Sequence, residues 1–391
     1  MGFFSKSKKT EDLMLVFDIG SSSVAGAFFK ATDSGVPKII YTTREPISLE
    51  KDINPERFLE LMLKTLEKVV YKMATRKIGA PKKVFCVLAS PWYASQTRVI
   101  KYSQETPFEF TQKLADSLIQ KEIKIFEDEN LKQYSDEQNK IRAIELRNMK
   151  ISLNGYDVQN PMGKKATSLE MTVFISMSPE QILSPMEKVI NMHFRCKEIK
   201  FSSFAMASFA VARNTFVHQD SFLLIDIGGE VTDISMVKKD VLSSSISFPL
   251  GRNFMIREVS ETLHCSLAEA KSYISLYKDG HAAKEVENKL EPIMKKLEAK
   301  WLKSFQESLV NLSNDISIPA TIFVTVDQEL NNFFSKIIKT EQFNQYTLTE
   351  SKFRIIFLGT EALHGIATFQ EETPRDAFLI IESIYINHFL R

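Results

Sequence analysis

The chain has 391 residues, with 50 basic and 49 acidic side chains and an ordinary hydrophobic content of 44%. This length predicts two or three domains rather than a single core, and the nearly cancelling charges argue against a nucleic-acid partner. The three cysteines are far apart and form no Cys-x-x-Cys pair, so the sequence predicts neither a disulfide framework nor a zinc site.

Residues 1–12, MGFFSKSKKTED, are expected to form a flexible tail. Its phenylalanines and lysines allow only a weak contact with an anionic bilayer. No apolar run approaches the ~18 residues that a membrane-spanning helix needs. We therefore expect a cytoplasmic protein whose association with a membrane is indirect or weak.

The first half of the chain alternates strands and helices. A hairpin is expected over 14–29, MLVFDIGSSSVAGAFF. A helix follows that begins at Asn54 and Pro55, a good N-cap and first-turn pair, and then a buried strand over 84–90. The pattern of apolar and charged residues then changes and predicts a strand of alternating apolar and polar residues, a charged helix and two further strands. These elements favour an inserted α+β subdomain and are predicted at 97–103, 111–132, 142–153 and 168–176.

In the second half, Ser178 and Gln181 bracket a predicted capping box, with Pro179 at the first helical position. A second hairpin is expected over 222–237, FLLIDIGGEVTDISMV. After it, the periodicity of apolar residues predicts helix, helix, strand, helix, strand and helix. Their ranges are 252–277, 283–314, 321–326, 329–339, 353–359 and 376–390.

The two hairpins share the triplet Asp-Ile-Gly, and Asp18 precedes Asp226 by 208 positions (226 − 18). Successive N–H groups of a glycine turn can converge on an anion, and a carboxylate at the end of the incoming strand can hold Mg²⁺ through its waters. Two such turns facing each other would bind the phosphates of a nucleoside triphosphate. The nucleotide-binding residues expected here are Asp18, Gly20, Ser21, Ser22, Ser23, Asp226, Gly228, Gly229 and Thr232, with Asp18 and Asp226 beside the metal.

Either hairpin alone is equally well explained as an ordinary turn between two strands. The pairing of the two, with the same apolar approach, favours the nucleotide site. Neither Gly-x-x-x-x-Gly-Lys-Ser/Thr nor Gly-x-Gly-x-x-Gly occurs in the chain, so the phosphate sites built on those motifs are not expected.

DIGSSSV and DIGGEVTDIS resemble the two phosphate motifs of the actin-like ATPase superfamily. Residues 154–176, NGYDVQNPMGKKATSLEMTVFIS, are similar to the Asn-Pro-x-Gly region of the inserted subdomain in the bacterial cell-division family FtsA. Residues 202–212 and 248–263 resemble that family's connecting helix and the segment after its second phosphate motif. DIGSSSV also resembles PilM, the FtsA-related adaptor family of type IV pilus machinery. The resemblance runs in order over most of residues 13–391.

The resemblance implies an α/β, actin-like ATPase fold. Two α/β domains would face a nucleotide cleft, and a small α+β subdomain of the type called SHS2 would be inserted in the first. The boundaries it implies are 13–91 and 178–218 for the first domain, 92–177 for the inserted subdomain, 219–360 for the second domain, and a closing helix of the first domain within 361–391.

The adenosine end of the expected site departs from the family. Val326 and Asp327 stand where the adenosine motif has glycines, and a β-branched side chain there intrudes on the nucleotide. The family's adenine-side Glu and Lys correspond to Glu269 and Lys271, the lysine one residue early.

The phosphate end departs as well. Glu230 and Val231 replace a Gly-Thr pair in the second phosphate motif, and Arg252 replaces a glycine after it. With both aspartates and the first turn intact, we expect ATP and Mg²⁺ to bind weakly and any hydrolysis to be slow. The sequence assigns no catalytic residue.

FtsA-like proteins are cytoplasmic adaptors that bind ATP, self-associate into filaments and tether the tubulin-like protein FtsZ to the membrane. The resemblance therefore implies a cell-division adaptor at the cytoplasmic face of the inner membrane. The alternative is a PilM-like adaptor that binds a short cytoplasmic tail of a pilus membrane protein. The last predicted helix, 376–390, reads as a buried closing helix rather than a membrane anchor and favours the alternative, whereas Asn160-Pro161-Met162-Gly163 favours the first. A small-molecule kinase of this fold is less well supported, because no catalytic base is found.

Overall fold

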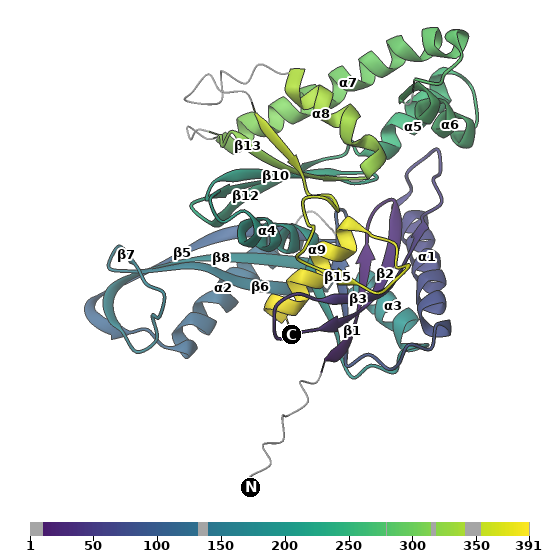
Figure 1. Cartoon of the computed structure of the whole chain (residues 1–391). Coiled ribbons are helices and arrows are strands. Elements are labelled where there is room, and N and C mark those ends of the chain that lie inside the picture. Colours follow the sequence, from purple (N-terminus) through teal and green to yellow (C-terminus); the bar gives the residue numbers. More distant parts are fainter. Residues whose placement is uncertain (1–10, 132–139, 279, 314–317, 341–352, 391) are drawn as a thin grey trace.

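The computed structural model describes residues 11–131, 140–278, 280–313, 318–340 and 353–390 (Figure 1). The first half of the chain forms β1 (Asp12–Ile19), β2 (Ser23–Ala31), β3 (Lys38–Pro46), α1 (Pro55–Thr75), β4 (Lys83–Leu88), β5 (Ala94–Glu109), α2 (Gln112–Leu131), β6 (Ile141–Leu153), β7 (Tyr156–Asp157), β8 (Lys165–Pro179), α3 (Glu180–Asn191), β9 (Ile199–Ser203) and α4 (Phe204–Thr215).

The second half forms β10 (Phe222–Ile227), β11 (Thr232–Lys238), β12 (Val241–Phe248), α5 (Arg252–Thr262), α6 (Leu267–Lys278), α7 (Lys284–Ser313), β13 (Thr321–Val326), the short 3-10 helix η1 (Gln328–Leu330), α8 (Asn331–Thr340), β14 (Arg354–Phe357), β15 (Thr368–Phe369), α9 (Ala377–Tyr385) and the π-helical turn η3 (Ile386–Leu390).

The first domain is built on a six-stranded sheet in the order β15-β3-β2-β1-β4-β9. Side chains of α1 and α3 cover one face of this sheet, and those of α4 and α9 cover the other. Helix α1 begins as expected: the Asn54 side chain accepts the N–H of Arg57 at 2.9 Å, and Pro55 is the first helical residue. Amphipathic helices on both faces bury the apolar strands that carry the first hairpin.

The inserted subdomain lies between β4 and α3 in the chain. Its strands form an antiparallel sheet in the order β5-β8-β6-β7, and α2 packs on one face. Figure 1 shows this sheet projecting sideways from the two domains, with α2 beneath it.

The second domain has a five-stranded sheet in the order β12-β11-β10-β13-β14. Helices α5 to α8 cover its outer face, where Trp301 is fully buried. Its inner face, with Phe222 and Phe323, belongs to the same core as Phe204 of α4 and Leu379 of α9. The two sheets therefore share one hydrophobic core, with α4 and α9 between them (Figure 1).

The two hairpins occupy equivalent places in the two sheets. Asp18 pairs with Ala25 across the first hairpin and Asp226 pairs with Asp233 across the second, so the offset of 208 persists in the strand register. Strand β1 also runs parallel to β4 as β10 runs parallel to β13. This is the repeat that the sequence predicts.

Two local predictions are wrong. The capping box at α3 does not form, because the Ser178 hydroxyl donates to the carbonyl oxygen of Trp92 at 2.7 Å and Pro179 is itself the N-cap. The single helix expected over 252–277 is two helices, since His264 has a φ of 52° between them. No helix in the described part of the chain is long and apolar enough to cross a membrane.

Candidate functional site

The turns of the two hairpins have the same hydrogen-bonding pattern. The Gly20 N–H donates to the Ser23 carbonyl oxygen at 3.1 Å, and the Gly228 N–H donates to the Val231 carbonyl oxygen at 2.9 Å. None of Gly20, Gly228 and Gly229 has a positive φ, so the reason for glycine here is space rather than backbone freedom.

The two turns contact each other directly. The Ser21 hydroxyl oxygen accepts the N–H groups of Gly229 and Glu230 at 2.9 and 3.1 Å, and both hydrogen bonds are buried. A Cβ atom on Gly229 would lie 2.7 Å from the Ser22 Cβ, far inside van der Waals contact. Glycine at 229 thus lets the first turn pack on the second, and the N–H groups expected to bind phosphate already bind a serine hydroxyl.

The first turn of α5 faces the same loop. A helix N-terminus leaves N–H groups free to bind an anion, but here the carbonyl groups of the second hairpin's turn accept them. The donor–acceptor pairs are Gly251–Glu230, Arg252–Gly228 and Asn253–Gly229, at 3.1, 3.0 and 2.8 Å.

Glu230, which departs from the second phosphate motif, has a structural role. Its buried carboxylate accepts Nη1 and Nη2 of Arg257 at 2.7 and 2.8 Å and Nδ2 of Asn253 at 2.8 Å. Arg257 also donates from Nε to the carbonyl oxygen of Glu50 at 2.9 Å. Because Glu50 belongs to the first domain, this arginine joins the two domains.

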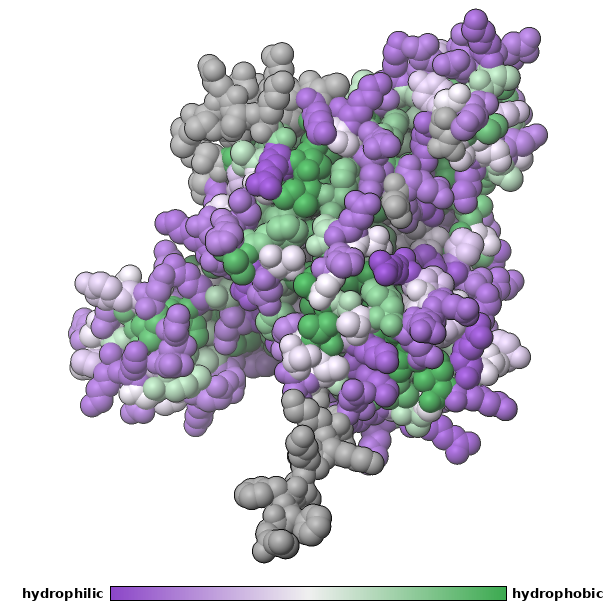
Figure 2. Space-filling view, viewed as in Figure 1, coloured by the Kyte–Doolittle hydropathy of each residue, from purple (hydrophilic) through white to green (hydrophobic). Residues whose placement is uncertain are grey.

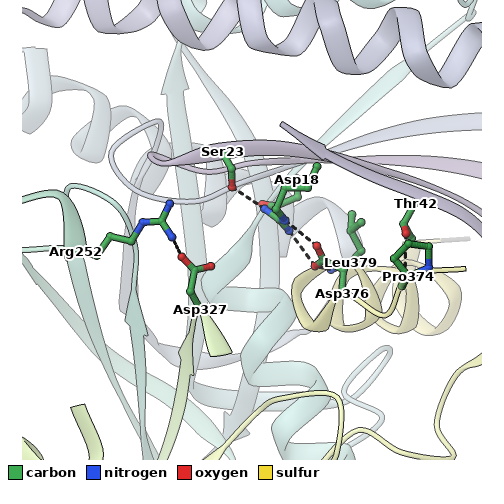
Figure 3. A network of polar contacts seen from close by, with 9 residues as sticks. Asp18, Ser23, Thr42, Arg252, Asp327, Pro374, Asp376 and Leu379 are labelled. Atoms are coloured by element: carbon green, nitrogen blue, oxygen red, sulfur yellow. Dashed lines mark hydrogen bonds and ion pairs between the residues drawn. The ribbon is translucent and has the colours of Figure 1, made fainter. Parts of the chain in front are cut away.

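In the first domain, Asp18, Ser23 and Asp376 lie close together (Figure 3), and Arg44 binds all three. Its guanidinium donates to Asp18 Oδ2 at 2.8 Å, to the Ser23 hydroxyl at 2.8 Å, and to both carboxylate oxygens of Asp376 at 2.7 and 2.9 Å. Burial raises the pKa of Asp18, and the charge of Arg44 opposes this rise. Burial acts in the same direction on Asp376, but Arg44 outweighs it and the pKa of Asp376 lies below its ordinary value.

Within the part of the chain that the structure describes, no cation is paired with the corresponding carboxyl of the second hairpin, that of Asp226. Burial, followed by the charges of Asp233 and Asp18, raises the pKa of Asp226 well above its ordinary value. Asp233 accepts the Ser90 hydroxyl at 3.0 Å and the Ser247 hydroxyl. The structure therefore brings Asp18 and Asp226 together across the cleft, beside a further carboxyl that the sequence analysis did not single out.

Glu382 of α9 lies next to Asp18 and is fully buried. Its carboxyl lies within hydrogen-bonding reach of Asp18, and its two oxygens have no other partner among the described residues. Burial, followed by the charge of Asp18, raises the pKa of Glu382 well above its ordinary value. The two carboxyls are compatible with each other when a proton is bound between them.

The end of β13 lies at the adenosine side, beside a pocket of about 290 Å³ that Val326 and Asp327 line together with Arg44. Val326 is the last residue of the strand and is buried, and Asp327 after it forms an ion pair with Arg252 (Figure 3). Arg252 and Asp327, which each stand in the place of a glycine, thus neutralise each other.

The remaining predicted residues are dispersed. Thr232 donates its hydroxyl to the carbonyl oxygen of Leu250 at 2.8 Å and accepts the Trp301 indole N–H at 3.3 Å, inside the second domain. Glu269 is exposed and accepts the N–H and hydroxyl of Ser266, a capping box for α6. Lys271 lines a pocket of about 150 Å³, together with Arg252, Asn253, Ile274 and Leu330.

This arrangement does not fit a Mg-nucleotide. Three N–H groups of the second turn and the first two of α5 are already bound, the two turns are in contact, and Asp18 is paired with Arg44. Within the described ranges, no group of three or more His, Cys, Asp or Glu side chains could hold a metal ion. We therefore derive no step through ATP or Mg²⁺.

Several residues of the cleft were missed by the sequence analysis. Arg44 pairs with Asp376, 332 positions away, and Arg257 contacts Glu50, 207 positions away. Glu382 lies within a helix that is otherwise almost wholly apolar. A charged residue inside an apolar element is a usable signal of a buried polar contact, but it does not identify the partner.

No protein-family model and no curated protein matches this sequence. A solved structure described as the PilM–PilN type IV pilus biogenesis complex is similar with a TM-score of 0.57 and 11% identity, over 98% of each chain. A Bacteroides thetaiotaomicron protein with an actin-like ATPase fold and unknown function is 9% identical over 98% of each chain, with a TM-score of 0.41. The ethanolamine utilization protein EutJ from Carboxydothermus hydrogenoformans is 10% identical over 97% of this chain and 90% of its own, also with a TM-score of 0.41.

At these identities the similarity concerns the fold alone. The chain has the α/β fold that the sequence analysis predicts, with two sheets that each carry one of the two hairpins. Its structure resembles a chain of the PilM–PilN complex over nearly its whole length.

Proposed function

We propose that this chain is an adaptor without catalytic activity that acts at the cytoplasmic face of a bacterial inner membrane. Its partner is the cytoplasmic tail of a membrane protein in a machine of the type IV pilus kind. Two observations support this: the full-length structural similarity to a chain of the PilM–PilN complex, and a cleft whose phosphate-binding groups are taken by the chain itself.

The observation that carries the proposal is a groove between the inserted subdomain and the first domain. It has a volume of about 330 Å³ and lies between β6 and β9. The apolar side chains that line it are Ile144, Leu146, Ile199, Phe201 and Leu390, and charged side chains of both signs flank them: Arg142, Glu145, Arg147, Glu198 and Lys200.

The groove suits an extended peptide. Strand β9 is the last strand of its sheet among the described residues. Apart from the Ser203 N–H, which Glu145 accepts, its outer edge can offer backbone N–H and C=O groups to an added strand. Leu146 is 39% exposed on the opposite wall. An apolar strip with charges of both signs at its rim fits a short tail with alternating apolar and charged residues.

The two walls of the groove are fixed before any partner binds. At one end, Glu145 Oε2 of β6 accepts the hydroxyls of Ser202 and Ser203 at 2.9 Å each and the Ser203 N–H at 3.1 Å. The Tyr385 hydroxyl of α9 donates to Glu145 as well. A preformed groove lowers the entropy cost of binding a flexible tail.

The test uses an array of synthetic peptides that covers the cytoplasmic tails of the inner-membrane proteins encoded in the source genome. We expect the full chain to bind at least one tail, and Leu146→Asp to weaken that binding at least about tenfold, which corresponds to ~1.4 kcal/mol. Ile125→Asp is the matched control, because Ile125 is 43% exposed on α2 and does not line the groove. Binding that survives Leu146→Asp, or no binding to any tail, would contradict the proposal.

The division-type partner favoured by the Asn160-Pro161-Met162-Gly163 stretch is the alternative. In the structure this stretch makes a turn before β8, with a hydrogen bond of 2.9 Å from the Gly163 N–H to the Phe110 carbonyl oxygen. It therefore has a sufficient local role within the fold. Co-sedimentation of the chain with polymers of the tubulin-like division protein, without binding to any tail peptide, would support the alternative.

A further inference from the structure

We propose that the cleft is a permanent latch, in which the chain's own groups occupy the places of the nucleotide's phosphate and its cation. The Ser21 hydroxyl takes the place of a phosphate oxygen and the Arg44 guanidinium that of the cation beside Asp18. The two domains are thereby held closed in the absence of nucleotide. This inference does not depend on the proposed adaptor function.

The first step of the argument is the hydrogen bonding of the turn. Two successive N–H groups, from Gly229 and Glu230, converge on one oxygen atom, which is the geometry of an anion-binding nest. The oxygen is supplied by Ser21 of the opposite domain. A phosphate could take these donors only if Ser21 left them.

The second step is space. Besides its short distance to the Ser22 Cβ, a Cβ atom on Gly229 would lie 2.9 Å from the Ser22 backbone N. The backbones of the two turns are therefore packed against each other where a phosphate would have to lie. Admitting one requires the domains to separate.

The third step is what opposes separation. Arg257 connects Glu230 to the Glu50 carbonyl oxygen of the first domain. Two further hydrogen bonds cross between the domains outside the turns, from the Ser90 hydroxyl to Asp233 at 3.0 Å and from the Thr97 hydroxyl to the Leu242 carbonyl oxygen at 2.7 Å. These contacts come from different loops and strands, so opening must break several at once.

The fourth step is charge. Arg44 and Arg252 are both paired with carboxylates, Arg44 with Asp18 and Asp376 and Arg252 with Asp327. The carboxyls that remain, Asp226 and Asp233, offer a triphosphate no positive charge. The latched state needs no added cation, because the buried carboxyls are compensated by Arg44 or by bound protons.

The first measurement is calorimetric titration of Mg-ATP, Mg-ADP and inorganic pyrophosphate into the full chain. We expect no binding with a Kd below about 1 mM. Binding of any of the three at micromolar concentration would overturn the proposal.

The second measurement is the distance between spin labels on the two domains, at Glu67→Cys of α1 and Lys296→Cys of α7, in a Cys196→Ser, Cys265→Ser background. Both label positions are exposed. We expect one narrow distance distribution that Mg-ATP leaves unchanged. A shift on adding Mg-ATP would overturn the latch.

Ser21→Ala removes the acceptor of both N–H groups and should broaden the distance distribution. Ser22→Ala is the matched control, because it keeps the Cβ atom that packs on Gly229. Arg257→Gln acts at a separate contact and should also broaden the distribution, which keeps the test valid if Ser21→Ala does not fold. Distributions as narrow as that of the parent chain in both Ser21→Ala and Arg257→Gln would show that these contacts do not hold the domains together.

Discussion

At the scale of single residues, the positions where the phosphate motif departs from its usual sequence are the ones that hold the cleft together. Glu230 stands where a glycine is usual, and its carboxylate binds Arg257 and Asn253. Asp327 and Arg252, which also replace glycines, form an ion pair. Because these substitutions supply each other's partners, they are better explained as one compensated set than as separate losses.

Glu230→Ala should therefore destabilise the fold, although it removes a residue that the motif does not require. It leaves Arg257 partly buried without its carboxylate partner, which typically costs about 3–5 kcal/mol. The free energy of unfolding from urea denaturation measures the effect. Glu258→Ala is the control: it breaks the more exposed Glu258–Lys300 pair and should cost less than about 1 kcal/mol. Equal effects of the two substitutions would contradict this account of Glu230.

Glu382→Gln should make the protein more stable, and increasingly so as the pH rises. Burial and Asp18 raise the pKa of Glu382 in the folded state above its ordinary value of 4.5. An acid with a raised folded pKa contributes stability that is fully present below the unfolded pKa and is lost as the pH rises through the folded pKa. Glutamine has no proton to lose.

We expect the variant and the parent chain to be nearly equally stable at pH 5, and the variant to be more stable by about 1 kcal/mol or more at pH 8. Denaturation at the two pH values measures this. Glu371→Gln, at an exposed position, should show no such change with pH. A difference that shrinks as the pH rises would refute the assignment of a buried, protonated Glu382.

At the scale of elements, α5 is placed by its first turn. Its first N–H groups bind the carbonyls of the second hairpin's turn, and Gly251 precedes them at very close approach: a Cβ atom there would lie 2.4 Å from the Gly229 carbonyl oxygen and 2.5 Å from that of Gly228. The backbone at Gly251 has a φ of −89°, which other residues can adopt. The glycine is therefore required for close packing of helix on loop.

Gly251→Ala should push α5 away from the turn and cost about 1–3 kcal/mol, as overpacked sites do. Gly359→Ala is the matched control, because a Cβ atom there meets no atom within 4 Å and its φ is not positive. Thermal unfolding of the two variants gives the comparison. If the Gly251→Ala protein is as stable as the parent chain, the loop of the second hairpin can move aside without loss of stability, which contradicts this prediction.

The elements themselves were largely predictable, and the contacts between them were not. The hairpins and long helices carry strong local signals, in apolar periodicity, the Asp-Ile-Gly repeat and the Asn54 cap. The break between α5 and α6 also has a local signal, the Ser266–Glu269 capping box, whose glutamate the sequence analysis assigns to nucleotide binding instead. The pairing of Arg44 with Asp376 had none, because only the fold brings these residues together.

At the scale of the whole molecule, the two domains share a core. The inner face of the second-domain sheet, α4 and α9 belong to one set of buried side chains with the first-domain sheet. Figure 2 shows a largely hydrophilic outer surface on the side in view, with apolar side chains gathered in patches. A shared core together with hydrogen bonds between the domains predicts that neither domain unfolds alone.

The two tryptophans allow this to be measured. Trp92 is buried in the first domain and Trp301 in the second. In the Trp92→Phe variant the fluorescence comes from Trp301, and in the Trp301→Phe variant it comes from Trp92. We expect the urea transitions of the two variants to have the same denaturant slope. In each variant, the midpoint measured by tryptophan fluorescence should equal the midpoint measured by far-ultraviolet circular dichroism. A fluorescence transition that precedes the circular dichroism transition in either variant would show independent domains.

The Ser21 hydroxyl that joins the two turns also bears on timing. Hydrolysis of a bound nucleotide limits how long a protein stays in one state, because each turnover is irreversible and changes that state. A hydroxyl of the chain itself is never consumed, so a cleft closed by Ser21 is in the same state before and after every encounter with a partner. How long a partner stays bound is then set by its own dissociation rate, and the fraction of the chain that is bound is set by the affinity and the local concentrations of both proteins. Any directionality in such an assembly has to be supplied by a different component.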